Sequence, residues 1–339
     1  MVARVRPVII IGGGPSGAAA ALTLLSAQIP VAILEQSQFP RFRPGETLHP
    51  GIESLLATLG VLSQVQSAGY VRHRGVWSGW GGTTQFVPYG EDGNGPWQGY
   101  QAIRKDFDHR LIEQAHIRGA QLLIAKVSGV FTSESGRVAG VMTSDGPIEG
   151  AYVIDCGGSS HSLARHLRIP IVRYSPSLVA RYGYVMGAYD APTPSIHPDQ
   201  DGWTWIAEVE PHRFQWTRVT ESHSRPTRTW LPASLQALQA EPSQSADVTW
   251  RMPKSVAGPG YFLAGDAAAV LDPSSSHGVL RAIMSGMMAA HLIVRHLCDG
   301  AGARVCAMTY QNWLASWFQH DREEMSRAYR AARLFGFNN

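Results

Sequence analysis

Residues 8–35 read VIIIGGGPSGAAAALTLLSAQIPVAILE, and the fold class follows from this stretch. The apolar, β-branched run at 8–11 is typical of a strand buried on both faces of a sheet. Glycines and a proline follow at 12–17, and the small and apolar residues at 18–25 favour a helix. A second apolar run at 29–34 predicts another buried strand. The stretch is therefore a complete strand–helix–strand unit of a parallel sheet, which predicts an α/β protein.

The glycines between the first strand and the helix have the Gly-x-Gly-x-x-Gly spacing of a dinucleotide-binding turn. Gly12 permits the tight turn, Gly14 lets a pyrophosphate approach the backbone, and Gly17 lets the helix pack close to the strand. Glu35 ends the second strand, where its carboxylate can accept hydrogen bonds from both ribose hydroxyls. The expected cofactor contacts of this turn also include Pro15 and Ser16. A glycine-rich structural turn is the alternative, and the motif alone does not separate FAD from NAD.

The composition excludes several classes of protein. Of 339 residues, 44% are hydrophobic and 16% are charged, and no apolar run approaches the ~18 residues of a membrane span. The start of the chain lacks the order of a signal peptide, so we predict a cytoplasmic protein without a membrane span. The net charge is +3 with scattered basic residues, which argues against nucleic-acid binding. The three cysteines and the histidines show no metal-ligand spacing, so no metal site is expected.

A second motif lies far along the chain. Residues 261–268 read YFLAGDAA, a short buried strand that ends in Gly-Asp. The segment 272–278, DPSSSHG, then precedes a helix of small residues that starts near Gly278. A helix starting there aims free N–H groups, with their partial positive charge, at the pyrimidine end of a flavin. A buried strand, loop and helix without a ligand is the alternative.

With these two motifs in this order, the sequence resembles the flavoprotein monooxygenase superfamily of the para-hydroxybenzoate hydroxylase type. That superfamily also contains the flavin halogenases and the prenyl reductases. The resemblance implies FAD as the cofactor, with Asp266 after Gly265 holding the ribityl chain and the Asp-Pro loop lying over the isoalloxazine ring. Arg104 resembles the arginine that the superfamily places beside the phosphate and ribityl groups. The loop residues expected at the flavin are Pro273, Gly278 and Val279.

The loop at 41–50, RFRPGETLHP, resembles the branch that contains tryptophan-halogenase-like flavoproteins. That branch also holds the flavoproteins that mature quinone cofactors from peptidyl tryptophan. The resemblance implies Arg43 as a cofactor contact and Glu46 and His49 as catalytic candidates near the reactive edge of the flavin. An ion pair between Arg43 and Glu46 that braces the loop is the alternative. His277, in the loop over the flavin, is a third catalytic candidate as a proton shuttle, with a hydrogen-bonded loop histidine as its alternative.

An aromatic pattern predicts the wall of a substrate site. Strand alternation puts Trp203 and Trp205 on one face. A hairpin across 210–212 brings Trp216 onto the neighbouring strand, and the three tryptophans are the expected contacts of an aromatic substrate. Packing within the sheet is the alternative. Halogenases carry a Trp-x-Trp-x-Ile-Pro signature here, but this chain lacks the Ile-Pro part, and the halogenase lysine is missing because residues 60–100 contain no lysine.

These motifs predict a Rossmann-type FAD-binding domain with an inserted, mainly β substrate domain and C-terminal helices. The predicted division is 1–75, 100–170 and 253–300 for the FAD-binding domain, 76–99 and 171–252 for the substrate domain, and 301–339 for the C-terminal helical segment. Long helices are predicted over 105–118, 279–297 and 304–334.

The leading functional hypothesis is an FAD-dependent monooxygenase. Reduced flavin would form a C4a-hydroperoxide with O₂, and the pocket must exclude water until the distal oxygen is transferred. Such transfer suits an electron-rich ring, and the resemblance makes an indole or tryptophan, free or in a peptide segment of a partner protein, the favoured substrate. The alternatives are a flavin-dependent ene reductase or dehydrogenase, a halogenase, and a non-enzymatic flavin-binding partner protein. No second Gly-x-Gly-x-x-Gly is present, so the reductant is NAD(P)H bound without that motif or a separate flavin reductase.

Overall fold

The computed structural model describes residues 6–43, 46–80, 82–224 and 230–337, and the predicted strand–helix–strand unit builds a six-stranded sheet within it. The strand order is β10-β2-β1-β14-β24-β23, in which all neighbours run parallel except the short edge strand β23. The strands are β1 (Val8–Ile11), β2 (Val31–Glu35), β10 (Gln121–Ile124), β14 (Tyr152–Asp155), β23 (Ala257–Gly258) and β24 (Tyr261–Leu263). The central strands are buried along their whole length, as parallel strands covered on both faces are. The α/β prediction is confirmed.

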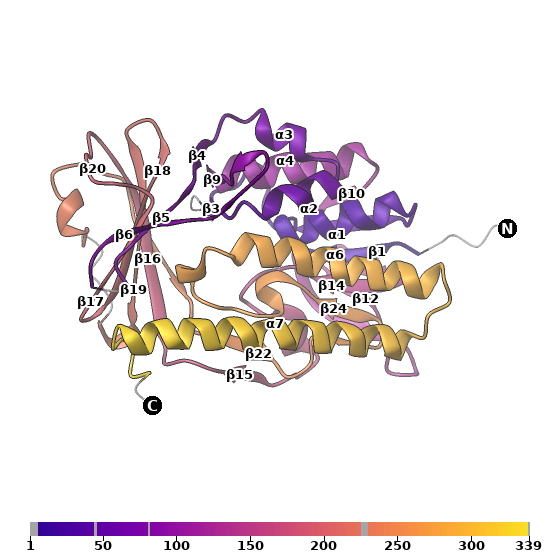
Figure 1. Cartoon of the computed structure of the whole chain (residues 1–339). Helices are drawn as coiled ribbons and strands as arrows, with labels where there is room; N and C mark the ends of the chain where they lie inside the picture. The colour runs from indigo at the N-terminus through magenta and orange to yellow at the C-terminus, as the bar shows by residue number, and fades with distance from the viewer. Residues whose placement is uncertain (1–5, 44–45, 81, 225–229, 338–339) are drawn as a thin grey trace.

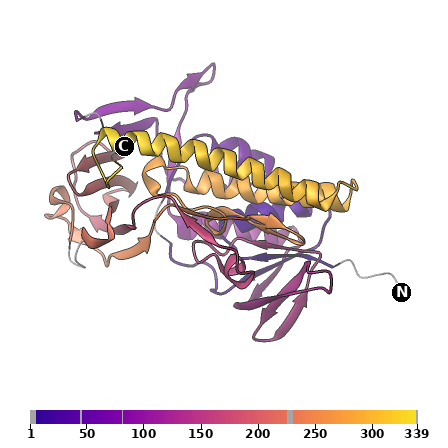
Figure 2. The same cartoon turned by 90° about the horizontal axis from the view of Figure 1, so that it is seen from below.

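Long helices form a layer against this sheet (Figure 1). Helix α1 (Pro15–Ser26) packs against α4 (Arg104–Ile117) and α6 (Gly278–Leu297), and α6 packs against α7 (Ala303–Ala331). Figure 2 shows α7 and α6 lying side by side along the molecule. These bounds confirm the three long helices that the sequence predicts. The shorter helices are α2 (Ile52–Thr58), α3 (Leu62–Gln66) and α5 (Ser162–His166).

Small residues let α1 and α6 approach closely. Ser16 in the first turn of α1 lies against Gly286 in α6, where a Cβ would overlap the Ser16 carbonyl oxygen. A Cβ on Gly265, just after β24, would lie 3.1 Å from the Ser16 Cβ. The first glycine turn and the Gly-Asp motif are therefore in contact, although most of the chain separates them in sequence.

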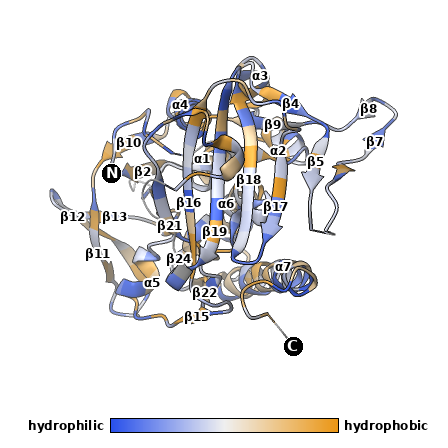
Figure 3. Ribbon diagram, turned by 90° about the vertical axis from the view of Figure 1, so that its left-hand side faces the viewer, coloured by the Kyte–Doolittle hydropathy of each residue, from blue (hydrophilic) through white to orange (hydrophobic). Residues whose placement is uncertain are grey.

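A second sheet lies beside the N-terminus of α6, and Figure 3 shows this sheet face-on. Its order is β20-β16-β19-β18-β17-β5-β6, and β21 also pairs with β16. The strands are β5 (Gly75–Ser78), β6 (Gln85–Pro88), β16 (Leu178–Met186), β17 (Ser195–Asp199), β18 (Gly202–Glu210), β19 (Arg213–Glu221), β20 (Gln239–Ala240) and β21 (Gln244–Asp247). The predicted hairpin across 210–212 joins β18 to β19. The predicted domain boundaries stay a prediction.

Smaller sheets connect these two layers. Part of the loop predicted at 41–50 is a strand, β3 (Glu46–Leu48), because β9 (Gly99–Ala102) pairs with it. Strand β12 of a three-stranded meander packs against β14 of the parallel sheet. The remaining strands are β4 (Val71–His73), β7 (Glu91–Asp92), β8 (Gly95–Pro96), β11 (Val127–Thr132), β12 (Val138–Thr143), β13 (Gly146–Glu149), β15 (Ile171–Arg173) and β22 (Arg251–Pro253).

Among the described residues, α6 is the one helix long and apolar enough to cross a membrane by length and composition. A buried helix of a protein core passes the same test, and α6 packs between α1 and α7. Val279, Ile283 and Ile293 of α6 are buried in the main core. The predicted cytoplasmic location stays a prediction.

Replacing Gly286 by alanine is expected to destabilise the protein, because the new methyl group overlaps the Ser16 carbonyl oxygen and must push α1 from α6. Overpacking of this kind costs about 1–3 kcal/mol, measurable as a lower unfolding free energy in chemical denaturation. Gly302→Ala is the matched control, since Gly302 has φ −62° and its Cβ would meet Val305 Cγ2 at an ordinary 3.6 Å. Equal stabilities of the two variants would contradict the close contact.

Candidate functional site

A cleft of about 950 Å³ opens where the carboxyl ends of the parallel strands face the second sheet. Strands β16, β18, β19 and β21 contribute its far wall. The predicted cofactor and substrate residues that line this cleft are Gly12, Gly14, Pro15, Ser16, Glu35, Arg43, Arg104, Trp203, Trp205, Gly265, Asp266, Pro273, Gly278 and Val279. The structure thus brings the two predicted motifs into one site, at the edge of the sheet where α/β proteins bind their ligands.

The N-termini of α1 and α6 are accessible from the cleft, because each carries a glycine there, Gly14 and Gly278. Among the described residues and within 4 Å, a Cβ on Gly14 would meet only Arg41 Nη2, at 3.4 Å, and a Cβ on Gly278 would meet none. The backbone of both residues is therefore accessible to a ligand, as a cradle for phosphates and for a flavin ring requires. Gly12, at φ +93°, provides the tight turn, and a Cβ on Gly17 would overlap the Gly12 carbonyl oxygen. Gly17 does not line the cleft and serves packing, as its place in the motif predicts.

The Glu35 carboxylate keeps acceptor capacity at the cleft. Its Oε2 accepts a hydrogen bond from the Gly13 N–H at 2.9 Å, and its Oε1 accepts one from the Ser37 N–H at 3.2 Å. Each carboxylate oxygen accepts about two hydrogen bonds, so capacity remains for ribose hydroxyls. The ribose contact of Glu35 fits this geometry and stays a prediction.

Arg41 is a site residue that the sequence motifs did not predict. Its side chain is 10% exposed, and its Nε lies 3.5 Å from Glu35 Oε2. Among the described residues, neither its Nε nor its Nη1 has a hydrogen-bond partner. Burial lowers the pKa of this guanidinium, and the Glu35 carboxylate opposes that shift. A buried cation with unused donors beside Gly14 suits the pyrophosphate of FAD. The available signal was its position two residues before Arg43 in the same loop.

The two predicted arginines line the cleft in different ways. Arg104 forms a bidentate pair with the buried Asp108, at 2.7 Å from Nε to Oδ1 and 3.0 Å from Nη2 to Oδ2. Asp108 Oδ2 also lies 3.8 Å from Arg41 Nη1. Arg43 is exposed at the mouth of the cleft. Arg104 is therefore held rigidly at the cofactor end, whereas Arg43 is exposed to solvent.

Asp266 points its side chain into the cleft. The residue is exposed there, and its carboxylate makes no hydrogen bond to any residue in the described part of the chain. Desolvation of the carboxyl between the walls of the cleft raises its pKa, while the positive charges of Arg104 and Arg251 oppose the shift. A carboxylate without a protein partner can accept hydrogen bonds from the ribityl hydroxyls, as predicted.

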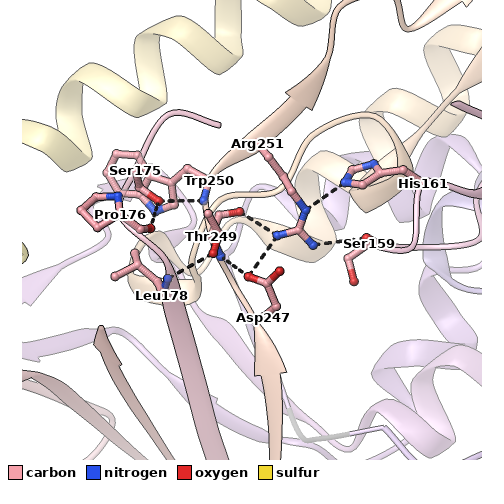
Figure 4. A network of polar contacts seen from close by, with 9 residues as sticks. All are labelled: Ser159, His161, Ser175, Pro176, Leu178, Asp247, Thr249, Trp250 and Arg251. Carbon is pink, nitrogen blue, oxygen red and sulfur yellow. Dashed lines mark hydrogen bonds and ion pairs between the residues drawn. The ribbon is translucent and has the colours of Figure 1, made fainter. Parts of the chain in front are cut away.

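A buried network that includes His161, Thr249 and Arg251 (Figure 4) reaches the backbone of Ala267, the residue after Asp266. His161 Nδ1 lies 2.9 Å from the Ala267 carbonyl oxygen and donates to it, because His161 Nε2 accepts a hydrogen bond from Arg251 Nε at 3.0 Å. Arg251 also donates to the Thr249 carbonyl oxygen at 2.8 Å. Burial lowers the pKa of His161, which agrees with a neutral ring between a carbonyl and a cation. Sequence motifs did not predict this network, because its members meet only in the folded chain.

Two of the three predicted tryptophans lie at the cleft, where their contact with a substrate stays a prediction, and the third does not. Trp203 and Trp205 of β18 line the cleft. The register pairs Trp205 with Thr217 and Ile206 with Trp216, so Trp216 faces the opposite side of the sheet. There it is fully buried in a separate core cluster and touches the Trp230 ring at 5.7 Å between centroids. The prediction of Trp216 as a substrate contact is wrong, because alternation defines two faces but not which one meets the cleft.

The predicted catalytic residues lie beside the cleft. The rings of His49 and His277 touch at 5.1 Å between centroids, although neither ring is part of the cleft lining. His49 Nδ1 accepts a hydrogen bond from the Gly51 N–H at 3.1 Å, and burial lowers its pKa. The side chain of Glu46 lies outside the described residues. Catalytic roles for Glu46, His49 and His277 stay predictions.

Acidification is expected to destabilise the protein through His277. Burial, with the positive charges of Arg281 and His49, lowers its pKa from 6.5 to about 4. Because the folded pKa lies below the unfolded value, the contribution of the neutral ring is complete above pH 6.5 and is lost as the pH falls from 6.5 toward 4. Chemical denaturation across this range should show a steeper loss for the wild type than for His277→Gln. Parallel curves for the two proteins would argue against this assignment.

Replacing Asp266 by alanine is expected to empty the FAD site. Loss of hydrogen bonds to a charged group raises the dissociation constant about 10- to 100-fold. The measurement is the visible absorbance of the purified protein, followed by FAD titration of the apoprotein. Asp201→Ala, in an exposed turn away from the cleft, is the control and should bind FAD as the wild type does. Unchanged occupancy in Asp266→Ala would mean that the Gly-Asp motif does not hold the flavin.

Comparison with curated proteins finds a halogenase and a reductase among the relatives. The chain is 26% identical over 328 residues to the tryptophan 2-halogenase of Chondromyces crocatus, covering 84% of this chain and 60% of that protein. It is 30% identical over 319 residues to the menaquinone reductase of Mycobacterium tuberculosis, covering 84% of this chain and 76% of that protein. The chain thus spans about three fifths of the length of the first relative and three quarters of the second.

Solved structures share the fold. The myxobacterial chondrochloren halogenase CndH aligns with a TM-score of 0.88 at 21% identity, covering 96% of this chain and 83% of that one. The peptidyl tryptophan dihydroxylase QhpG aligns with a TM-score of 0.74 at 19% identity, covering 97% and 74%. The sequence profile of the tryptophan halogenase family matches residues 7–93 and 82–333. Because the matched segments take in nearly the whole chain, this protein belongs to the tryptophan halogenase family.

Proposed function

We propose that this enzyme is a monooxygenase that hydroxylates the indole ring of tryptophan, free or within a peptide segment of a partner protein. The observation that carries the proposal is that the cleft has an aromatic wall but lacks the lysine amine of the halogenases. Trp203 and Trp205 line the cleft, and the chain has no lysine between residues 60 and 100, where halogenases of the family carry theirs. Among the described lining residues the one lysine is Lys126, beside Ala125, whose N–H donates to the Glu35 carbonyl oxygen at 2.9 Å. Lys126 thus follows a residue that pairs with the end of β2, and it does not belong to β18, the strand that carries both tryptophans.

Names of relatives support an indole substrate. The Chondromyces relative is a tryptophan halogenase, and the structural neighbour QhpG is a dihydroxylase of peptidyl tryptophan. Hydroxylation and halogenation both attack an electron-rich ring carbon, so both use a flat aromatic wall. The absent lysine then favours oxygen transfer over halogenation.

In this proposal, different residues of the cleft bind the cofactor and the substrate. When bound and reduced, FAD supplies the electrons that activate O₂ for transfer of one oxygen atom to the ring. Arg41 and the start of α1 bind the diphosphate, and Asp266 orients the ribityl chain. In this proposal the substrate ring lies against β18 at Trp203 and Trp205, which line the cleft and are held in place by a core cluster that includes Tyr329. A separate flavin reductase supplies the reduced cofactor in this proposal.

Reduction of a carbon–carbon double bond is the second candidate. The observation in its favour is the 30% identity to a menaquinone reductase, the highest among the relatives described above. An isoprenoid chain would need an apolar path, whereas the wall beside Trp205 also carries the polar side chains of Gln215 and Thr217. The amide of Gln215 donates to Thr217 Oγ1 at 2.6 Å, which keeps both groups at the cleft.

Product mass distinguishes the candidates. The enzyme is incubated with FAD, NADH, a flavin reductase and ¹⁸O₂ in chloride and bromide buffer, with N-acetyltryptophanamide or a tryptophan peptide as substrate. The expected product gains oxygen that carries the ¹⁸O label. Replacement of hydrogen by halogen would identify a halogenase. Formation of a product with two added hydrogen atoms from menaquinone, without labelled indole, would favour the reductase.

Variants of the wall test the substrate position. Trp205→Phe is expected to raise the KM for the tryptophan substrate about fivefold, because the smaller ring loses stacking area. Trp216→Phe is the matched control, since Trp216 lies on the opposite face of the same sheet. Equal KM values for the two variants would show that Trp205 does not contact the substrate.

A further inference from the structure

The loop that opens the start of α6 is tied to the C-terminal helix. Asp272, the first residue of the loop at 272–278, is 2% exposed and accepts three hydrogen bonds. Its Oδ2 accepts from Trp250 Nε1 and from Tyr329 Oη, each at 2.6 Å, and its Oδ1 accepts from the Ser274 N–H at 3.0 Å. Tyr329 lies near the end of α7, far from the loop in sequence.

The same tyrosine hydroxyl contacts the aromatic wall. Trp203 Nε1 donates to Tyr329 Oη at 2.9 Å, while that hydroxyl donates its own proton to Asp272. Trp203 is 1% exposed and Tyr329 is 0% exposed, so neither group has water as a substitute partner. One hydroxyl therefore connects the loop on the cofactor side of the cleft with the wall on the substrate side.

Packing holds the tyrosine in place. Its ring contacts Trp80, Trp250 and Phe335, with centroid distances of 5.5, 5.5 and 5.1 Å. A further polar contact of α7, the ion pair of its Asp321 with Arg281 of α6 at 2.5 Å, involves a residue that lines the cleft, Arg281. The end of α7 is thus a rigid support, and movement of the hydroxyl would require this cluster to repack.

We infer that Tyr329 is a positioning residue that sets the distance between the flavin ring, held by the loop at 272–278, and the aromatic substrate, held by Trp203. The ring of Tyr329 does not line the cleft, so it acts through Asp272 and Trp203. The inference rests on FAD binding in the cleft, as in the proposed function, but not on hydroxylation as the reaction. A phenylalanine in its place keeps the packing and leaves Asp272 short of one donor and the Trp203 N–H without an acceptor.

The test compares Tyr329→Phe with Tyr310→Phe in the FAD-loaded protein. Tyr310 lies on the same helix, is equally buried, and donates to the Leu263 carbonyl oxygen at 2.7 Å without touching the loop. The readouts are hydrogen exchange of the amides at 274–279 and the visible spectrum of the bound flavin. In Tyr329→Phe we expect these amides to exchange about tenfold faster, the effect of one lost hydrogen bond to a charged group, and the flavin bands to shift.

In Tyr310→Phe we expect a similar loss of thermal stability with loop exchange and flavin bands as in the wild type. Loop exchange and spectrum in Tyr329→Phe that match those of Tyr310→Phe would overturn the inference. If Tyr329→Phe does not fold, Trp250→Phe removes the other side-chain donor to Asp272 and should loosen the same loop; an unchanged loop would again overturn it. These readouts do not depend on product identity, so failure of the hydroxylation assay leaves them interpretable.

Discussion

The contact of Ser16 with Gly265 and Gly286 is the constraint on which the site depends. Strand β14 lies between β1 and β24 in the sheet. The loops that follow β1 and β24 can still meet, because the residues at their contact, Ser16 and Gly265, are small. The Ser16 hydroxyl also donates to Cys156 Sγ, at 3.4 Å, in the loop after β14. Ser16 therefore contacts the loops that follow β14 and β24. Without this close approach, the glycine turn and the Gly-Asp motif could not bind one molecule.

Charge is divided along the cleft. The cofactor end combines Arg41 with the carboxylates of Glu35 and Asp108, and burial lowers the pKa of Arg41 while both carboxylates oppose that shift. Such a cation is costly until an anion arrives, so a diphosphate stabilises the folded site as well as binding to it. The far wall has tryptophans, the neutral polar groups of Gln215 and Thr217, and the carboxylate of Asp247 on β21. In the proposed function, the cofactor end receives the phosphorylated part of FAD and the far wall receives the aromatic substrate.

The C-terminal helix links these two ends. Because Tyr329 contacts both Asp272 and Trp203, the geometry of the cleft depends on a segment distant from both motifs. The same kind of support acts on the other side, where His161 and Arg251 hold the backbone beside Asp266. Precise spacing between a flavin and a ring carbon requires such buried support, since small displacements reduce the rate of atom transfer.

Local patterns in the sequence determined the strand–helix–strand unit, the start of α6 at Gly278 and the hairpin between β18 and β19, because glycine turns and residue periodicity act over a few neighbouring residues. The two motifs, in their order along the chain, also carry the resemblance to flavoproteins that implied FAD as the cofactor. Tertiary structure alone decided that Trp216 faces away from the cleft, that Arg41 has unused donors, and that Tyr329 meets Asp272. Each of these depends on which face of an element packs inward and on contacts between residues far apart in the chain, and neither is encoded in a local pattern.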